Sequence, residues 1–122
     1  MNAIVLDYHD NIAKVRTDVG VFEGIWRADP PVKGKYYVLE LACDDIIEQD
    51  QLQHSKIAEP SISNDENGIV VNGLLEEVED NVAFLRFFGN LFMLEILPSC
   101  DFSQHIGHNV TIRLSNIEMY VI

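Results

Sequence analysis

The chain has 122 residues, of which 48% are hydrophobic, and a net charge of −12 from 20 acidic and eight basic side chains. This length corresponds to about one ordinary domain, and the apolar fraction is higher than is typical of a disordered chain. The acidic balance argues against binding to nucleic acid or docking on an anionic membrane, because both attract basic patches. No apolar run approaches the roughly 20 residues of a membrane span, and residues 1–10 lack signal-peptide features, so we expect a cytoplasmic protein.

The first 47 residues predict a small β unit. Residues typical of strands are concentrated in the segments 3–8, 12–16, 21–26 and 36–43. Turn residues separate these segments at Asp10-Asn11, at 18–20 and at 30–34. Short apolar segments with closely spaced turn signals are typical of antiparallel β structure.

Residues 48–67 predict an acidic linker. Asp44 or Asp45 as N-cap, with Glu48 nearby, favours a short helix of at most two turns at the start of the linker. The stretch PSISNDENG (60–68) has the composition of an exposed loop.

Residues 68–122 predict a second β unit. Its expected strands are 69–78, 82–88, 91–97, 109–115 and 117–121. In the stretch NVTIRLSN (109–116), apolar and polar residues alternate as in a half-buried strand. Four or five strands in about fifty residues suggest a small barrel or meander, of the size of an oligonucleotide-binding-fold or SH3-like barrel.

The two units repeat one another. NAIVLDYHDNIAKVR (2–16) aligns without a gap on NGLLEEVEDNVAFLR (72–86) at an offset of 70, with five identities, and the similarity resumes between 34–47 and 107–120 at an offset of 73. We therefore expect an all-β fold of two duplicated antiparallel units packed together, with 12–16 and 82–86 in equivalent positions and the joining segment outside both. A single mixed β-sandwich is the alternative.

The second unit is the more apolar one. Ten of the fourteen residues in 84–97 are apolar, against six of fourteen in the aligned segment 14–27. A strand that is apolar on both faces is usually buried on both. We expect unit two to form the centre of the molecule, with its extra face against unit one. The residues expected to be buried are Phe84, Leu85, Phe92, Leu94 and Ile96. A homodimer contact, with Phe88 as candidate, is the other explanation.

The negative charge is segregated along the chain. Residues 42–81 have a net charge of −10, whereas 1–41 and 82–122 have −1 each. Segregated charge creates a directional field, so we expect an acidic docking surface for a basic protein; a merely solvated loop is the alternative. The candidate partner-binding residues are Asp44, Asp45, Glu48, Asp50, Asp65, Glu66, Glu76, Glu77, Glu79 and Asp80.

No motif indicates catalysis, a cofactor or a metal. His105 and His108 follow Cys100 and Asp101, but the paired cysteines of a zinc signature are missing. The many adjacent carboxylates are spaced so that neighbours on a strand point to opposite faces, which does not suit acid–base catalysis. We expect a protein that is not an enzyme and has no cofactor and no metal.

One feature of unit one favours nucleic acid. Trp26, Tyr36 and Tyr37 lie near Arg27, Lys33 and Lys35 in the sequence. Aromatic side chains beside basic ones can stack on single-stranded bases. An oligonucleotide-binding-fold-like function is therefore the less favoured alternative.

In size and in the ten acidic residues named above, the chain resembles the small immunity proteins that bacteria make against their own cationic toxins. The resemblance rests on size and charge and not on a motif. It implies a basic toxin domain, often a nuclease, as the partner. A housekeeping or phage-derived binding module with an unknown ligand is the competing interpretation.

Overall fold

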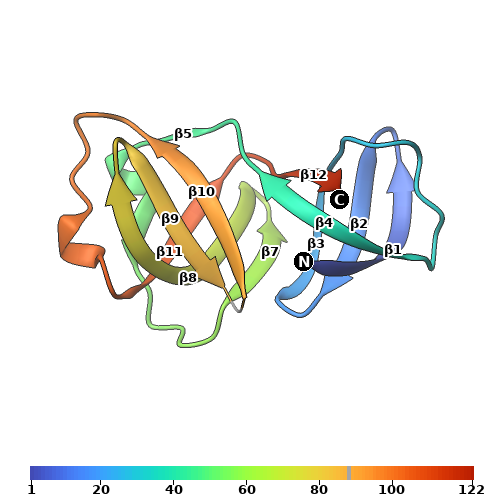
Figure 1. The fold of residues 1–122 in the computed structure, drawn as a ribbon, viewed down its shortest axis with the longest axis horizontal. Coiled ribbons are helices and arrows are strands. Elements are labelled where there is room, and N and C mark those ends of the chain that lie inside the picture. The colour runs from blue at the N-terminus through green and yellow to red at the C-terminus, as the bar shows by residue number, and fades with distance from the viewer. Residues whose placement is uncertain (88) are drawn as a thin grey trace.

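A computed structural model describes residues 1–87 and 89–122, so Phe88, the candidate homodimer contact, lies outside the described residues. The predicted all-β class is confirmed: the described residues form twelve strands and two short 3-10 turns. Five strands close a ring in the order β1-β2-β3-β12-β4, which we call the first barrel (Figure 1). Its strands are β1 (Asn2–His9), β2 (Ile12–Thr17), β3 (Gly20–Trp26), β4 (Tyr36–Ala42) and β12 (Glu118–Val121).

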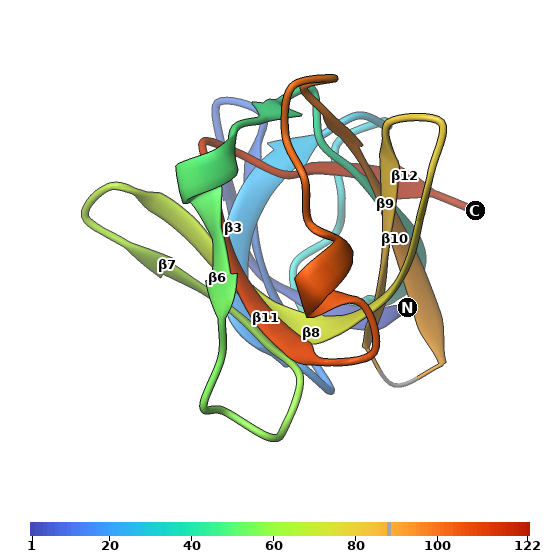
Figure 2. The same ribbon diagram turned by 90° about the vertical axis from the view of Figure 1, so that its left-hand side faces the viewer.

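The other seven strands form a second sheet in the order β5-β10-β9-β8-β11-β6, with β7 paired to β8. They are β5 (Ile46–Ile47), β6 (Leu52–His54), β7 (Ser61–Asp65), β8 (Gly68–Glu79), β9 (Val82–Phe87), β10 (Asn90–Ile96) and β11 (Asn109–Leu114). The 3-10 turn η1 (Gln49–Gln51) joins β5 directly to β6, and a second turn, η2 (Ser103–His105), precedes β11. The chain itself thus links the two ends of the sheet, and the strands curl into a ring that we call the second barrel (Figure 2).

Both barrels are Greek keys. Strands β1, β2 and β3 are joined by hairpins, and β4 returns to pair with β1; β8, β9, β10 and β11 repeat this order. A fourth strand that returns beside the first defines the Greek key. This order excludes a simple meander and agrees with the five-stranded Greek-key architecture of oligonucleotide-binding folds.

The duplication extends to irregular details of the backbone. The β1–β2 ladder has a bulge between Val5 and Asp7, and the β8–β9 ladder has one between Leu75 and Glu77, at the same offset of 70. Both hairpins turn on an Asp-Asn pair with positive φ, at Asp10-Asn11 and Asp80-Asn81. A two-residue turn with both φ values positive matches the twist of a hairpin and favours these residues. The prediction that 12–16 and 82–86 are equivalent is confirmed.

The second block of similarity also has a structural basis. Gly34 and Gly107 have φ angles of +85° and +84°, a conformation that a side chain would disfavour. Each glycine donates its N–H to the strand facing it, Gly34 to Val5 O and Gly107 to Leu75 O, both at 2.7 Å. The three extra residues of the second unit therefore lie between the third and fourth strands, as the change of offset predicts.

The two barrels exchange their closing segments. After β4, the chain leaves the first barrel, and residues 46–54 pair with β10 and β11 of the second. After β11, the chain returns, and β12 pairs with β3 and β4 of the first barrel. Figure 1 shows β12 in red among the blue strands, and β5 in green beside the orange β10. The expectation that the joining segment lies outside both units is wrong, because each unit is completed by residues from the other half of the chain.

The rest of the joining segment is also more ordered than a loop. The expected helix is only the single turn η1, with Glu48 as N-cap in a capping box with Gln51. Residues 61–65 form β7, which pairs with β8 of the second barrel. On its other side β7 reaches the first barrel, where Ile62 N donates to Val19 O at 2.8 Å. This strand, which we call the β7 arm, ties the two barrels together.

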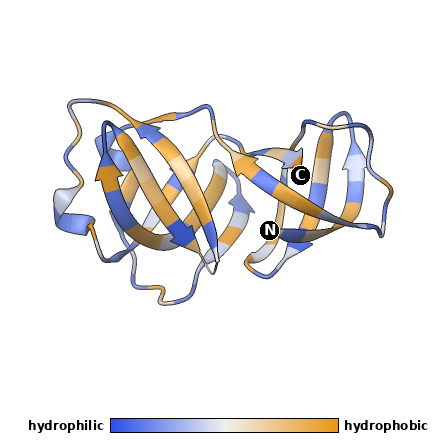
Figure 3. Ribbon diagram, viewed as in Figure 1, coloured by the Kyte–Doolittle hydropathy of each residue, from blue (hydrophilic) through white to orange (hydrophobic). Residues whose placement is uncertain are grey.

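Apolar and polar residues alternate along the strands of both barrels, as the orange and blue bands in Figure 3 show. Leu85, Phe92, Leu94 and Ile96 are buried as expected. Phe84 is only half-buried, however, and the outward-facing side chains beside it, Leu91 and Met93, are 43% and 56% exposed. The prediction that the second unit packs its extra apolar face against the first is therefore wrong.

Within the described residues, no helix has the length and apolar character to cross a membrane.

Candidate protein-binding surface

The ten predicted acidic residues do not share one face. Asp65 and Glu66 lie at the turn that begins β8, whereas Glu79 and Asp80 lie at the turn that ends it. Along a strand of 12 residues these turns are roughly 35–40 Å apart, measured along the strand at its usual rise. The charge segregation in the sequence therefore becomes several separate acidic positions on the second barrel.

Asp45, Asp65 and Glu76 are among the ten carboxylates that other side chains or backbone groups engage. Asp65 forms an ion pair with Arg113, Glu76 pairs with Arg86 at 2.7 Å, and the carboxylate of Asp45 accepts a hydrogen bond from Ser115 N at 2.8 Å. The arginine partners lower the pKa of Asp65 and the pKa of Glu76 below the usual carboxyl range. These three acids are less suited to meet a partner than the exposed, unpaired ones.

Four other predicted acids come together at one end of the second barrel. Glu79 ends β8 and Asp80 begins the β8–β9 turn, which meets the end of β10 through a hydrogen bond of 2.8 Å from Ile96 N to Asn81 O. The end of β10 in turn meets β5, where Leu97 N donates to Ile47 O at 3.0 Å. Glu48 and Asp50 follow β5 directly, so all four lie along the same edge of the barrel.

Two acids outside the predicted set complete this edge. Glu95 pairs with Val82 on one side and with Ile46 on the other, which places it between the β8–β9 turn and β5. Asp101 N donates to Gln49 Oε1 at 3.0 Å, which holds Asp101 beside η1. We call the six residues the acidic rim: Glu48, Asp50, Glu79, Asp80, Glu95 and Asp101.

The acidic rim carries no opposite charge in its own segments. Residues 44–51, 76–82 and 95–101 contain ten acidic residues and no Lys or Arg. The hydroxyl and N–H of Ser103 lower the pKa of Asp101, so that carboxylate is ionised at neutral pH. Glu95 and Asp101 belong to a nearly neutral part of the sequence, so a charge count along the chain does not reveal them; the pairing of β10 does.

Another charged cluster lies where the closing segments cross. Glu118 on β12 is buried and accepts hydrogen bonds from Arg27 at 2.7 Å and from the Tyr120 hydroxyl at 3.0 Å. Hydrogen bonding to Asp44 and then to Arg27 lowers the pKa of Glu118, while the same contact with Glu118 raises the pKa of Asp44. These contacts hold β12 in the first barrel, so the role of this cluster is structural.

The aromatic residues of the first barrel are mostly occupied within the fold. Trp26 is buried, its Nε1 donates to Asp29 O at 2.8 Å, and its ring meets Tyr37 edge-on at 5.2 Å. The Tyr37 hydroxyl accepts a hydrogen bond from Val32 N. Of these three aromatic residues, only Tyr36, which is 72% exposed, presents its ring to solvent. A stacking platform needs several free rings, so this arrangement does not favour single-strand binding.

Three of the four histidines lie around one surface depression. His54 and His108 face each other with ring centroids 6.1 Å apart, and His105 lines the same shallow surface depression. Among the residues that the structure describes, no three His, Cys, Asp or Glu side chains are placed so that they could hold one metal ion. Comparison of the chain with protein-family models, curated proteins and solved structures finds no match.

Proposed function

We propose that the protein is a non-catalytic binding protein that captures a basic protein partner on its acidic rim. The observation that supports this most is the convergence of three separate segments, each acidic and free of Lys and Arg, on one edge of the second barrel. Solubility alone requires charge but not its concentration at one edge. A concentrated field accelerates the encounter with an oppositely charged surface.

The partner that best fits this surface is a cationic toxin domain, and the proposed role is that of an immunity-type inhibitor acting in the cytoplasm. The active-site cleft of a nuclease is positively charged because it holds a phosphate backbone. A rigid β edge lined with carboxylates can occupy such a cleft in place of nucleic acid. The resemblance to toxin-immunity proteins in size and charge supports the same role.

The duplicated fold provides a matched pair of variants to test the rim. The first combines Glu79→Lys with Asp80→Asn in the acidic rim; the second combines Glu23→Lys with Asp10→Asn in the first barrel. Both change the net charge equally, and Asp10 and Asp80 have nearly identical φ angles of 49° and 50°. Asparagine tolerates this conformation, so neither turn is strained.

The wild-type protein and both variants are used to isolate partners from the native host, and association rates are then measured across a range of salt concentrations. We expect the rim variant to associate at least about tenfold more slowly at low salt, and the first-barrel variant to behave as wild type. Higher salt should slow wild-type association, because screening acts within about 8–10 Å at physiological ionic strength. A partner that binds both variants equally, with no dependence on salt, would refute the proposal.

A further inference from the structure

One edge of β10 lacks a strand partner over most of its length. On one side β10 pairs with β9 from Asn90 to Glu95; on the other it pairs with β5, and only at Glu95 and Ile96. Because Ile96 N donates to Asn81 O, the alternation of an antiparallel ladder directs the N–H and C=O of Leu91 and Met93 away from β9. Within the described residues no backbone partner meets this edge at Leu91 or Met93.

The first barrel shows what covers an edge of this kind. There β3 corresponds to β10, and it too pairs with its closing segment only at its end, at Ile25 and Trp26. Its remaining edge is covered by the β7 arm. The carboxamide of Asn64 accepts a hydrogen bond from Glu23 N at 2.7 Å and donates to Glu23 O at 3.3 Å. Glu23 corresponds to Met93, so the same two backbone groups are bound in one barrel and open in the other.

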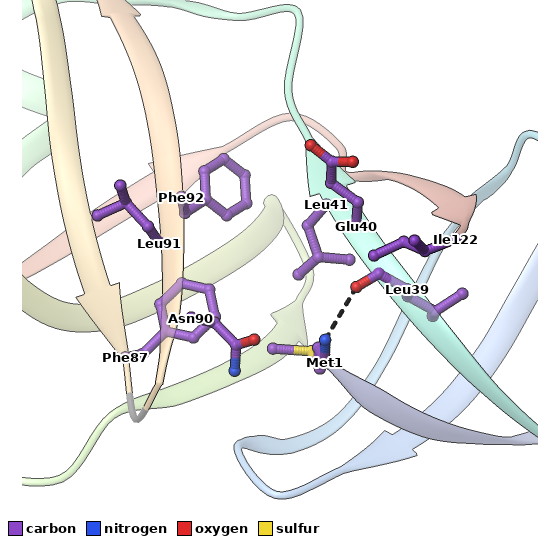
Figure 4. Close-up of a pocket in the computed structure, with 9 residues that line it drawn as sticks. All are labelled: Met1, Leu39, Glu40, Leu41, Phe87, Asn90, Leu91, Phe92 and Ile122. Carbon is purple, nitrogen blue, oxygen red and sulfur yellow. Dashed lines mark hydrogen bonds between the residues drawn. The ribbon is translucent and has the colours of Figure 1, made fainter.

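The open edge borders an apolar crevice between the barrels, with a volume of about 140 Å³ (Figure 4). Its apolar walls are formed by Met1, Leu39 and Leu41 of the first barrel and by Phe87, Leu91 and Phe92 of the second. A cavity of this size accepts an apolar group about as large as a benzene ring. Glu40 lines the same crevice, and Figure 4 shows its carboxylate on the side away from Met1.

The outer surface beside this edge is also apolar. Leu91 and Met93 are exposed, and Met93 pairs across the strands with the half-buried Phe84. The corresponding positions of the first barrel hold Val21, Glu23 and Lys14, so two positions that are charged there are apolar beside the open edge. Adjacent apolar surface on an exposed sheet edge is the usual setting for an added strand.

We propose that the β10 edge at residues 91–93 is a docking site for an extended segment of a partner protein, which adds a strand to the second barrel along the edge that corresponds to the one the β7 arm covers in the first. The segment pairs with the backbone of Met93, places one apolar side chain in the crevice, and carries a basic residue toward Glu40. At the start of β10 the docked segment meets the side chain of Asn90, at the position where the first barrel has Gly20. Pairing with the docked segment therefore begins at Leu91. This inference does not depend on the acidic rim, since none of its contacts involves a residue of the rim.

The site can be tested with a peptide derived from the β7 arm. The probe is acetyl-KPSISNKK-amide, which retains the arm's central residues and replaces its three acids by lysine; a scrambled peptide of the same composition is the control. Binding is followed by NMR of the labelled protein at about 0.15 M salt, where surface electrostatics are screened beyond about 8 Å. Met93→Pro removes the N–H that points away from β9, and proline is tolerated at such a position of an edge strand. Met93→Ala changes only the side chain.

We expect saturable shifts at residues 91–93, at least about tenfold slower amide exchange at Leu91 and Met93, and no binding of the scrambled peptide. Met93→Pro should weaken binding about tenfold, which equals about 1.4 kcal/mol, and Met93→Ala should weaken it less. The proposal is overturned if the peptide does not bind, if it perturbs the acidic rim instead, or if wild-type protein without peptide shows concentration-dependent shifts at 91–93, which would assign the edge to a second copy. The peptide shifts on wild-type protein decide the matter even if Met93→Pro fails to fold.

Discussion

Glu118 is the residue whose role is least visible in the sequence and clearest in the structure. It is an isolated acid near the end of the chain, yet it is buried and bound by Arg27, 91 positions earlier. A buried carboxylate is stable only where charge and hydrogen bonds compensate its lost hydration. The contact therefore requires β12 to lie in the first barrel, and no local sequence pattern predicts this placement.

Glu118→Gln should lower the free energy of unfolding by about 1–2 kcal/mol at pH 7, a modest value because the Arg27 side chain is 47% exposed. The pKa of Glu118 is lowered in the fold, so its stabilising effect is present above the ordinary carboxyl range and is lost as the pH falls through the folded value. Asp44 acts in the opposite sense, because its pKa is raised. Urea unfolding of the wild-type protein and of Glu118→Gln should show a smaller difference in unfolding free energy at pH 3 than at pH 7. An equal or larger difference at pH 3 would exclude an ionised Glu118.

Cys43 provides a second test at this scale. Burial raises the pKa of its thiol to about 11 from an ordinary value of 9.0. Only the thiolate reacts. At a pH below the pKa, each unit by which the pKa rises reduces the thiolate fraction about tenfold. In a Cys100→Ser background, iodoacetamide at pH 8 should modify native Cys43 about 100-fold more slowly than the same chain in urea. Equal rates would show that this thiol is not buried.

At the scale of single elements, the sequence predicts the strands and hairpins well where the signal is local. The Asp-Asn turns, the alternation of 109–114 and the offset of 70 all correspond to features of the backbone. Strand β12 was predicted at 117–121 but not its place in the first barrel, and two-residue β5 was not predicted at all, because both depend on pairing with strands far along the chain. The acidic rim was predicted only in part for the same reason, since β10 brings Glu95 to it.

Strand β10 has a sharply divided pattern that mutations can verify. Leu94 is 1% exposed and points into the second barrel, whereas Leu91 is on the outer face. Leu94→Ala should destabilise the protein by roughly 2–5 kcal/mol through the cavity that it leaves. Leu91→Ala should cost under about 1 kcal/mol. Urea midpoints of the two variants provide the measurement, and similar losses would contradict the assigned faces.

The whole molecule consists of two copies of one Greek key that have exchanged their last strands. Each barrel is incomplete without ten or fewer residues from the other half of the chain. The barrels therefore cannot be separated by cutting the chain at the boundary that the sequence repeat indicates. The two copies share a backbone, but they differ in charge and in what covers their third strands.

The exchange is tested most directly by a pair of equivalent mutations read out by native-state hydrogen exchange. Ile47 and Met119 are both fully buried, and they pair with Ile96 of β10 and Trp26 of β3 at corresponding positions. Ile47→Ala should accelerate amide exchange chiefly in β8–β11, although it lies in the first half of the sequence. Met119→Ala should accelerate exchange chiefly in β1–β4 and perturb the fluorescence of Trp26, although it lies at the other end of the chain. If each mutation instead loosened the half of the sequence to which it belongs, the exchanged arrangement would be contradicted.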